Sequence, residues 1–303
     1  MTITTTAPDA GATSDDAPET VVGVRGLRMS YGSHEVLRGI DFDIGRGEIV
    51  ALLGPNGAGK STTIEILEGF RLRSAGEVTV LGTDPAHGDE AWRARLGIVL
   101  QSWRDHGKWR VRQLLHHFAG FYLPYATDPW DVDELLAQVG LTEHADRTIA
   151  ALSGGQRRRL DIAVGIVGRP EVLFLDEPTV GFDPQARSEF HEMVRGLAGD
   201  RMTILLTTHD LHEAEKLADR VLILAQGRIA AHGTIDELAR DLDGTAEVTW
   251  TSGGRSHRER TTDVSAFMRD LLDRDGEAQD LRVHRPTLED IYLNLVRDTE
   301  ANR

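Results

Sequence analysis

The chain has no cysteine among its 303 residues. This absence excludes disulfide bonds, thiolate metal ligands and cysteine redox chemistry, and it fits a reducing compartment. Long apolar runs are also missing, since no stretch approaches the roughly 18 uncharged apolar residues that a membrane-spanning helix needs. Residues 1–20 have neither a basic residue nor an apolar run, so we expect no signal peptide there. Their content of Thr, Asp, Ala and Pro predicts a disordered acidic tail.

An excess of positive charge is absent as well. Lys and Arg number 34 against 49 Asp and Glu, which gives a net charge of −15. Broad binding of nucleic acid needs a basic surface, so this balance argues against nucleic acid as a partner. The remaining composition, with 40% hydrophobic and 27% charged residues, is ordinary for a globular protein. The length allows one large domain or two smaller ones.

The most informative segment reads GPNGAGKS over residues 54–61. It fits the phosphate-binding pattern GxxxxGK[ST], and it has the context that this pattern requires, because a strand-like run (48–53) precedes it and a helix-like run (62–69) follows it. The glycines allow backbone N–H groups to turn toward the β- and γ-phosphates, and the helix start adds partial positive charge. The alternative interpretation is an ordinary Gly-rich turn between a strand and a helix.

We expect this loop to bind the phosphates of a nucleotide. Lys60 would reach the phosphates, and the hydroxyl of Ser61 would hold Mg²⁺. The residues expected to contact the nucleotide are Gly54, Pro55, Asn56, Gly57, Ala58, Gly59, Lys60, Ser61 and Thr62.

A second motif is the apolar run at residues 171–175, which ends in Asp176 and Glu177. The run reads as a buried parallel strand, so Asp176 would lie at the carboxyl edge of the sheet, where ligands bind in open α/β folds. There Asp176 could bind Mg²⁺ or its water shell, and Glu177 could polarise the water that attacks the γ-phosphate. The alternative is a pair of solvated, inert carboxylates at a strand end.

Two further polar residues follow strand-like runs. His209 follows residues 202–208, and Gln101 follows residues 96–100. We expect His209 to sense the γ-phosphate from the same sheet edge, although a lone histidine is more often structural. Three strands that each end in a polar or charged residue, together with the strand that leads into the phosphate loop, are not predicted by core packing alone.

Residues 152–156 read LSGGQ and open a helix-like segment. Ser153 and Gln156 satisfy the capping-box pattern, which is the structural interpretation. However, Gly154 and Gly155 fall in the first turn, where each costs roughly 1 kcal/mol relative to Ala.

Three arginines follow at once, at positions 157–159, although the helix dipole disfavours cations there. Both features are explained if a phosphate docks onto this helix end, with the glycines allowing close approach and the arginines raising the local potential.

The chain resembles the ATP-binding subunit of an ABC transporter over roughly residues 21–233. The motifs that carry the resemblance are GPNGAGKS, Gln101, LSGGQ, VLFLDEP, Gly181-Phe182-Asp183 and Thr208-His209-Asp210. Tyr31 matches the aromatic residue that stacks on adenine in this family. Phe182 departs from the more usual Leu, which affects only fine packing.

The resemblance implies the fold and the roles of the site residues. It implies an α/β P-loop NTPase core with a mostly parallel sheet, an antiparallel β subdomain (about 21–53), a helical signature subdomain (about 109–168) and a small α+β extension (234–303). It also implies that ATP and Mg²⁺ are bound, with Glu177, His209 and Gln101 catalytic and with Ser61, Gln101 and Asp176 at the metal. Ser153, Gly154, Gly155 and Gln156 would contact the nucleotide of a second, head-to-tail subunit. Asp183 would also contact nucleotide.

Two segments carry further expectations. Residues 102–110 combine Trp103 and Trp109 with basic residues, which suits an anchor for a membrane subunit, although a solvated loop is the alternative. Residues 286–290 read PTLED, with Thr287 as a helix N-cap. This ending resembles the ATPase subunits of daunorubicin and ABC-2 type drug exporters.

The leading hypothesis is therefore the ATP-hydrolysing subunit of a two-component exporter, located peripherally at the cytoplasmic face of the membrane. Its partners would be a separate transmembrane permease and a second copy of the chain or a paralogous ATPase subunit. The alternative is a soluble ABC ATPase that acts on ribosomes or nucleic acid, which the single LSGGQ motif, the lack of a long heptad repeat and the net charge of −15 disfavour. A catalytically silent subunit would be expected to lack Glu177 or His209, and both are present.

Overall fold

The computed structural model describes residues 19–99, 107–125, 128–198, 202–241, 246–275, 278–284 and 287–301. Gln101, Trp103 and nearly all of the expected N-terminal tail lie outside these ranges. None of the helices in the described ranges is both long and apolar enough to cross a membrane.

A six-stranded sheet forms the centre of the molecule, in the order β5-β6-β7-β3-β8-β9. All neighbouring pairs are parallel except β8 and β9. The strands are β3 (Ile49–Leu53), β5 (Leu96–Val99), β6 (Val172–Asp176), β7 (Thr203–Thr208), β8 (Arg220–Ala225) and β9 (Arg228–Gly233). Every residue of β3 and β7 is buried, because elements cover both faces of the sheet, so these strands show no alternation of apolar and polar residues.

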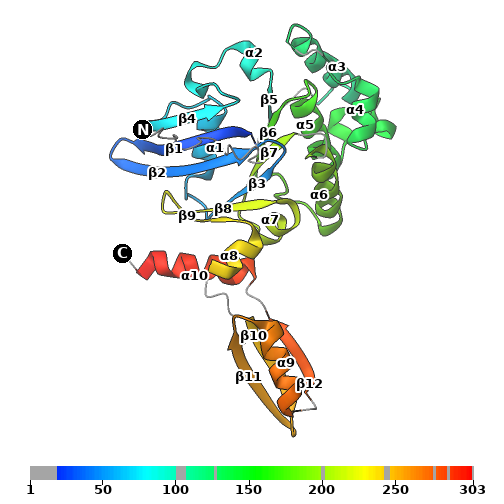
Figure 1. The fold of residues 1–303 in the computed structure, drawn as a ribbon. Coiled ribbons are helices and arrows are strands. Elements are labelled where there is room, and N and C mark those ends of the chain that lie inside the picture. The colour runs from blue at the N-terminus through cyan, green and yellow to red at the C-terminus, as the bar shows by residue number, and fades with distance from the viewer. Residues whose placement is uncertain are drawn as a thin grey trace, which may run out of the picture.

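A second, antiparallel sheet has the order β2-β1-β4 (Figure 1). It consists of β1 (Thr20–Tyr31), β2 (His34–Gly45) and β4 (Ala75–Val80). The sequence placed residues 49–53 in this subdomain. That prediction was wrong, since β3 lies in the central sheet between β7 and β8, and β4 takes the place beside β1. A fully apolar strand needs cover on both faces, and the central position supplies it.

The expected helical segment is present between β5 and β6 and lies to one side of the central sheet in Figure 1. It contains α3 (Val111–Tyr122), α4 (Val132–Gln138), the short 3₁₀ turns η2 (Thr142–His144) and η3 (Ile149–Ala151), and α5 (Gly154–Ile166). The other helices of the main body are α1 (Lys60–Leu67), α2 (Glu90–Arg93), α6 (Pro184–Ala198) and α7 (Leu211–Leu217), with a 3₁₀ turn η1 (Pro85–His87).

Trp109 belongs to this helical segment rather than to an exposed anchor. Its side chain is half-buried, packs against the main core and meets the ring of His117 edge-on at a centroid distance of 5.1 Å. The expectation of an exposed Trp109 is therefore wrong, whereas its contact with a membrane subunit stays a prediction.

The chain ends in a small extension below the main body in Figure 1. Its elements are α8 (Ile235–Asp241), β10 (Ala246–Ser252), β11 (Arg255–Thr261), α9 (Val264–Asp275), β12 (Gln279–His284) and α10 (Leu288–Ala301). The three strands pair antiparallel in the order β11-β10-β12, and α9 covers them over a core of Val248, Trp250 and Leu271. By contrast, α8 and α10 place Leu238 and Ile291 in the core of the main body. As expected, Thr287 caps α10, since its Oγ1 accepts the N–H of Asp290 at 3.3 Å.

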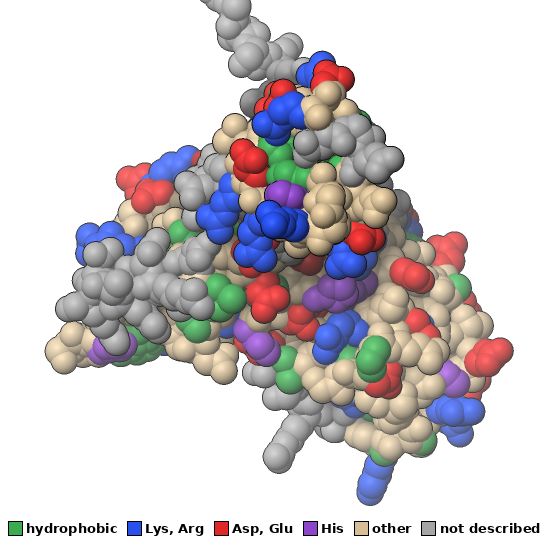
Figure 2. Space-filling view, turned by 90° about the horizontal axis from the view of Figure 1, so that it is seen from below, with side chains coloured by type: hydrophobic (Ala, Val, Ile, Leu, Met, Phe, Trp, Pro, Cys, Tyr) green, Lys and Arg blue, Asp and Glu red, His purple; other side chains and the backbone are tan. Residues whose placement is uncertain are grey.

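On the face that Figure 2 shows, the coloured Lys and Arg side chains lie interspersed with Asp and Glu side chains. The part of this face that the structure describes therefore has no broad basic field, in line with the negative net charge of the chain.

Candidate nucleotide site

The loop between β3 and α1 has the shape that a phosphate cradle requires, and its glycines are needed for that shape. A Cβ atom on Gly54 would lie 2.4 Å from the carbonyl oxygen of Leu224. Gly59 has φ of 110°, and a Cβ there would lie 2.6 Å from Cδ2 of Leu37. Only glycine fits both positions, and α1 then starts at Lys60. The helix N-terminus lies directly against the loop, which is the arrangement that binds phosphate.

Lys60 is held inside this loop. Its side chain is 5% exposed, and Nζ donates to the carbonyl oxygen of Gly54 at 2.9 Å. Nζ also lies 3.4 Å from Oε1 of Glu177. A buried ammonium group requires such partners, because desolvation of an unpaired charge is costly. The ammonium group is therefore positioned before a phosphate is present.

Ser61 and Asp176 form a donor set that suits Mg²⁺. Oγ of Ser61 lies 3.4 and 3.5 Å from the two carboxylate oxygens of Asp176, which ends β6. A hydroxyl and a carboxylate are the hard oxygen ligands that Mg²⁺ prefers. Thr207 of the neighbouring strand donates its hydroxyl proton to Asp176, which orients the carboxylate. Sequence reasoning missed this role of Thr207, because a threonine inside an apolar strand gives no separate signal.

Glu68, at the end of α1, is a second residue that the sequence did not single out. It is 3% exposed, and burial raises the pKa of its carboxyl group to about 8, with the nearby charges of Asp176 and Glu65 acting in the same direction. The carboxyl therefore holds its proton at neutral pH in this protein.

Glu177 lies where the chain turns out of β6, with φ of 42°. This left-handed conformation is strained for a residue with a side chain, and such strain concentrates at functional sites. The backbone N–H of Glu177 donates to the hydroxyl oxygen of Thr207 at 3.0 Å, which helps to hold the turn. Its carboxylate lies between two cationic or potentially cationic groups, Lys60 at 3.4 Å and Nδ1 of His209 at 3.3 Å.

These contacts bring together most of the residues that the sequence predicted for the phosphate site. A cavity of about 370 Å³ is lined by Glu177 and by the loop residues Asn56, Gly57, Gly59, Lys60, Ser61 and Thr62. His209 is 52% exposed and does not line this cavity, but it contacts Glu177, which does. Gln101 lies outside the described residues, so its expected role stays a prediction.

Tyr31 lies at the end of β1 and is 43% exposed. The guanidinium of Arg71 lies over its ring, 5.0 Å from the ring centroid, and Arg71 is itself held by the carboxylate of Glu65. An exposed aromatic ring at this place can stack on a nucleobase. That role of Tyr31 stays a prediction.

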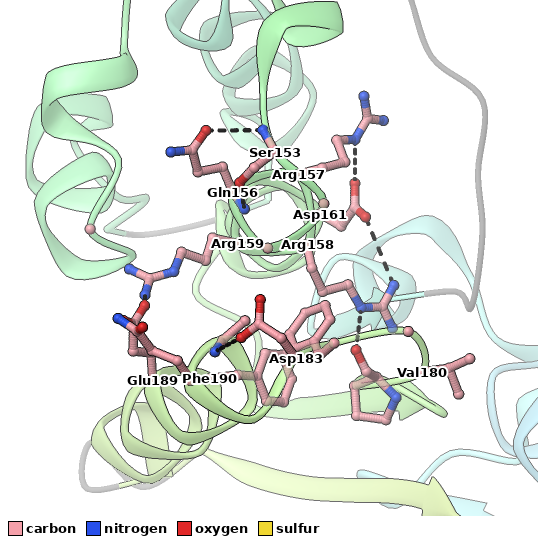
Figure 3. Close-up of a pocket in the computed structure, with 18 of the residues that line it drawn as sticks. Ser153, Gln156, Arg157, Arg158, Arg159, Asp161, Val180, Asp183, Glu189 and Phe190 are labelled. Carbon is pink, nitrogen blue, oxygen red and sulfur yellow. Dashed lines mark hydrogen bonds and ion pairs between the residues drawn. The ribbon is translucent and has the colours of Figure 1, made fainter.

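The LSGGQ residues line a different and larger cavity, of about 690 Å³ (Figure 3). Ser153, Gly154, Gly155 and Gln156 border it from the start of α5. Asp183 borders it too, and there Asp183 caps α6 by accepting the N–H of Ala186 at 2.8 Å. Lys60 does not line this cavity, whereas Glu177 lines both. The phosphate loop and the LSGGQ motif of one chain therefore open onto separate spaces.

The three arginines after LSGGQ have partners within the chain (Figure 3). Arg157 lies 3.1 Å from Asp161, and Arg159 pairs with Glu189. Arg158 is buried and donates to the carbonyl oxygen of Pro178 at 2.9 Å. All three also line the cavity that the LSGGQ residues line, and their expected effect on the potential for a phosphate stays a prediction. Arg158 joins α5 to the loop after β6, and Arg159 joins it to α6, whereas the Arg157–Asp161 pair lies within α5.

The comparison with known proteins agrees with this geometry. Residues 37–180 match the family model described as ABC transporter. The daunorubicin resistance ATP-binding protein DrrA3 of Streptomyces coeruleorubidus is 35% identical over 92% of this chain and 97% of that protein. The chain belongs to the ABC transporter ATP-binding family.

Other relatives of this ABC protein carry related names. A Nod factor export ATP-binding protein of Ralstonia nicotianae is 42% identical over 72% of this chain and 68% of that protein. A linearmycin resistance ATP-binding protein of Bacillus subtilis is 36% identical over 75% of this chain and 74% of that protein. A solved ATP-binding subunit of an ABC transporter superposes with a TM-score of 0.64 at 29% identity, over 74% of this chain and 94% of that one. The predicted α/β P-loop fold and the predicted membership of the drug-exporter group of ABC ATPases are confirmed.

Proposed function

We propose that this ABC ATPase is the motor subunit of a two-component exporter. In this proposal two chains close head-to-tail around ATP and Mg²⁺ and drive a separate permease. The observation that supports it most is the pairing of Lys60 and Glu177 at the phosphate cavity, with the LSGGQ motif on a separate cavity. A motif that lines a different cavity from the phosphate loop of its own chain is available to meet the nucleotide of a second chain.

In the proposed reaction, ATP and Mg²⁺ would be held by the loop residues 54–62, Ser61 and Asp176. Mg²⁺ would supply charge neutralisation at the phosphates. Glu177 would accept a hydrogen bond from the attacking water, and His209, 3.3 Å from Glu177, would keep that carboxylate aimed and approach the γ-phosphate. Lys60 would move its contact from the Glu177 carboxylate to the phosphate oxygens, which releases Glu177 for the water.

The cargo would be a small molecule chosen by the permease. Relatives of similar identity are named for daunorubicin resistance, Nod factor export and linearmycin resistance. Such different names on similar ATPase chains are explained if selection of the cargo lies in the membrane subunit.

The permease would dock on exposed apolar side chains around α2. Phe70 (67% exposed) follows Gly69, which lies against Trp92 of α2. Leu123 is 68% exposed, and the nearby Tyr125 hydrogen-bonds Glu90 of α2. Exposed apolar groups on two segments that meet at one short helix suit a protein partner better than solvent.

Glu177→Gln tests the proposal directly. The variant keeps the phosphate cradle but loses the carboxylate, so ATP hydrolysis should fall at least about 100-fold while ATP binding remains. It should then accumulate as an ATP-bound dimer, measured by size-exclusion chromatography with light scattering. Near-parental turnover would remove Glu177 from the reaction, and a monomer at saturating ATP would contradict dimer closure. Stimulation of the parental ATPase by RNA or ribosomes would instead favour the soluble alternative.

A further inference from the structure

His144 contacts the LSGGQ motif through an unusual hydrogen-bond pair. It ends the 3₁₀ turn η2, and its Nε2 lies 2.9 Å from Nε2 of Gln156 in the first turn of α5. The amide oxygen of Gln156 accepts the backbone N–H of Ser153 at 3.0 Å. Nδ1 of His144 is sealed from solvent and has no hydrogen-bond partner among the described residues.

These contacts determine where the protons lie. The backbone N–H of Ser153 can only donate, so the side chain of Gln156 must turn its oxygen toward it. The NH₂ group of Gln156 then faces His144, whose Nε2 must be the acceptor. A neutral histidine with an accepting Nε2 carries its proton on Nδ1, which is the buried atom. An imidazolium ring would set an N–H against the NH₂ group and break the pair.

The consequence reaches the hydroxyl of Ser153. The backbone N–H of Gln156 donates to Oγ of Ser153 at 3.3 Å. Because one lone pair of this oxygen is taken by a donor, the hydroxyl proton points elsewhere. Ser153 lines the 690 Å³ cavity, so its hydroxyl can donate there to an anion. Gln156, by contrast, has its oxygen and its NH₂ group engaged within the chain.

We propose that His144 is a positioning residue for the LSGGQ motif. Its neutral Nε2 holds the Gln156 amide, and the amide in turn keeps Ser153 ready to donate to the γ-phosphate on a second chain. This step rests on the proposed head-to-tail dimer. It assigns Gln156 to the support of Ser153 rather than to contact with the nucleotide.

The segment that carries His144 is anchored to the start of α3. The N–H of Arg112 donates to the carbonyl oxygen of Ala145 at 2.9 Å, and the N–H of Val111 donates to that of Arg147 at 3.1 Å. His144 therefore also fixes the first turn of α5 relative to the N-terminus of α3. His144 is therefore one of the contacts through which a displacement of α3 would reach Ser153.

Two substitutions at position 144 separate the hydrogen bond from simple packing. His144→Phe keeps a ring but removes the acceptor, and kcat for ATP hydrolysis should fall about fivefold. His144→Gln places an amide oxygen where Nε2 lies, so its kcat should stay within about twofold of the parent. His116→Phe, at an exposed histidine on α3, is the matched control and should leave kcat unchanged. The ATP affinity of the separated chains should not change in any of these variants, because the phosphate loop is untouched.

Mixed dimers test whether the effect crosses between chains. One mixture pairs His144→Phe with Lys60→Ala, so the intact phosphate loop faces an intact His144. The other pairs the parent with a chain that carries both changes, so the intact loop faces the altered motif. Isolated by two affinity tags, the first heterodimer should be about fivefold faster.

Any one of three results would overturn the role of His144. The two heterodimers could hydrolyse ATP at equal rates, His144→Phe could keep the parental kcat, or His144→Gln could lose as much kcat as His144→Phe does. Those results leave the proposed function intact as long as the parent hydrolyses ATP and dimerises with it. A parent that does neither would overturn both proposals.

Discussion

Lys60 is a cation that the fold buries before any phosphate arrives. Its neighbours, the carbonyl oxygen of Gly54 and the carboxylate of Glu177, can hold the charge but are not its best partners. Charge-assisted hydrogen bonds to phosphate are stronger than those to a neutral carbonyl. The loop is thus arranged so that binding of nucleotide improves the surroundings of a group that is already desolvated.

Lys60→Ala should therefore weaken ATP binding itself. Loss of one charge-assisted contact predicts a rise in Kd of about 10- to 100-fold, measured by titration calorimetry. Lys216→Ala, which removes an exposed lysine on α7, should leave the Kd unchanged. Equal affinities of the Lys60→Ala variant and the parent would mean that the ammonium group does not bind the phosphates.

Glu68 makes the stability of the nucleotide-free protein depend on pH. Its folded-state pKa of about 8 lies above the ordinary value of 4.5. Between these two values the folded chain holds a proton that the unfolded chain has lost. The stabilising contribution of this proton is therefore complete below the unfolded-state pKa of 4.5 and is lost as the pH rises through the folded-state pKa of about 8.

Glu68→Gln should remove this dependence, because the amide resembles the protonated acid and cannot ionise. Between pH 6 and pH 8.5 the parent should lose about 2 kcal/mol more unfolding free energy than the variant, measured by urea denaturation without nucleotide. Glu77→Gln, at an exposed position on β4, should lose as much as the parent does. Parallel curves for the parent and Glu68→Gln would show that Glu68 is ionised in the folded protein.

At the scale of elements, local patterns predicted the helices and strands that carry their own signals. Helix α1 followed from its place after the phosphate loop and α10 from its cap at Thr287. Strands β4 and β12 were missed, because their pairing is set by distant partners: β4 lies beside β1, and β12 beside β10 across the intervening β11 and α9. Strand propensity depends on such neighbours more than on the segment itself.

The site shows the same division. Lys60, Asp176 and Glu177 were predictable because each follows a pattern written in consecutive residues. Thr207 and Glu68 were not, since their roles arise only where β7 and α1 come next to Asp176. The ion pair of Arg159 was not predictable either, because its carboxylate partner Glu189 on α6 lies 30 residues further along the chain.

Trp109 and Leu123 flank α3 and should behave oppositely. Trp109 is half-buried against the core, so Trp109→Ala should lower the unfolding free energy by about 2 kcal/mol, measured by urea denaturation.

Leu123 is 68% exposed, so Leu123→Ser should leave stability and basal ATPase activity unchanged. If the permease docks beside α2, Leu123→Ser should still reduce copurification with a coexpressed ABC-2 type membrane subunit. A loss of basal activity in Leu123→Ser would argue that this side chain is part of the fold instead.

At the scale of the whole molecule, the two cavities predict that one chain cannot complete a site. Glu177 lines both cavities. The phosphate loop, however, lines only the cavity with Lys60, and the LSGGQ motif lines only the cavity with Ser153. If a site forms between chains, each ATP is held by the phosphate loop of one chain and covered by Ser153 of the other. A defect in either motif then disables a different half of the composite site.

A mixture of two inactive variants tests this arrangement. Lys60→Ala disables the phosphate loop. Ser153→Arg places a bulky side chain in the contact with the other chain, but the chain that carries Ser153→Arg keeps Lys60, Ser61 and Tyr31 for ATP. A mixed dimer has one site with an intact Lys60 and an intact facing Ser153, and its other site carries both defects. If one site can hydrolyse ATP alone, mixing should restore part of the ATPase activity, up to about half per dimer when the sites are independent.

No recovery in heterodimers proven by tag pull-down would mean either that the motif acts within its own chain or that both sites must hydrolyse ATP together. A crosslink between cysteines introduced at positions 61 and 153 would then decide. A bond between chains under ATP supports obligate coupling, whereas a bond within one chain overturns the composite site.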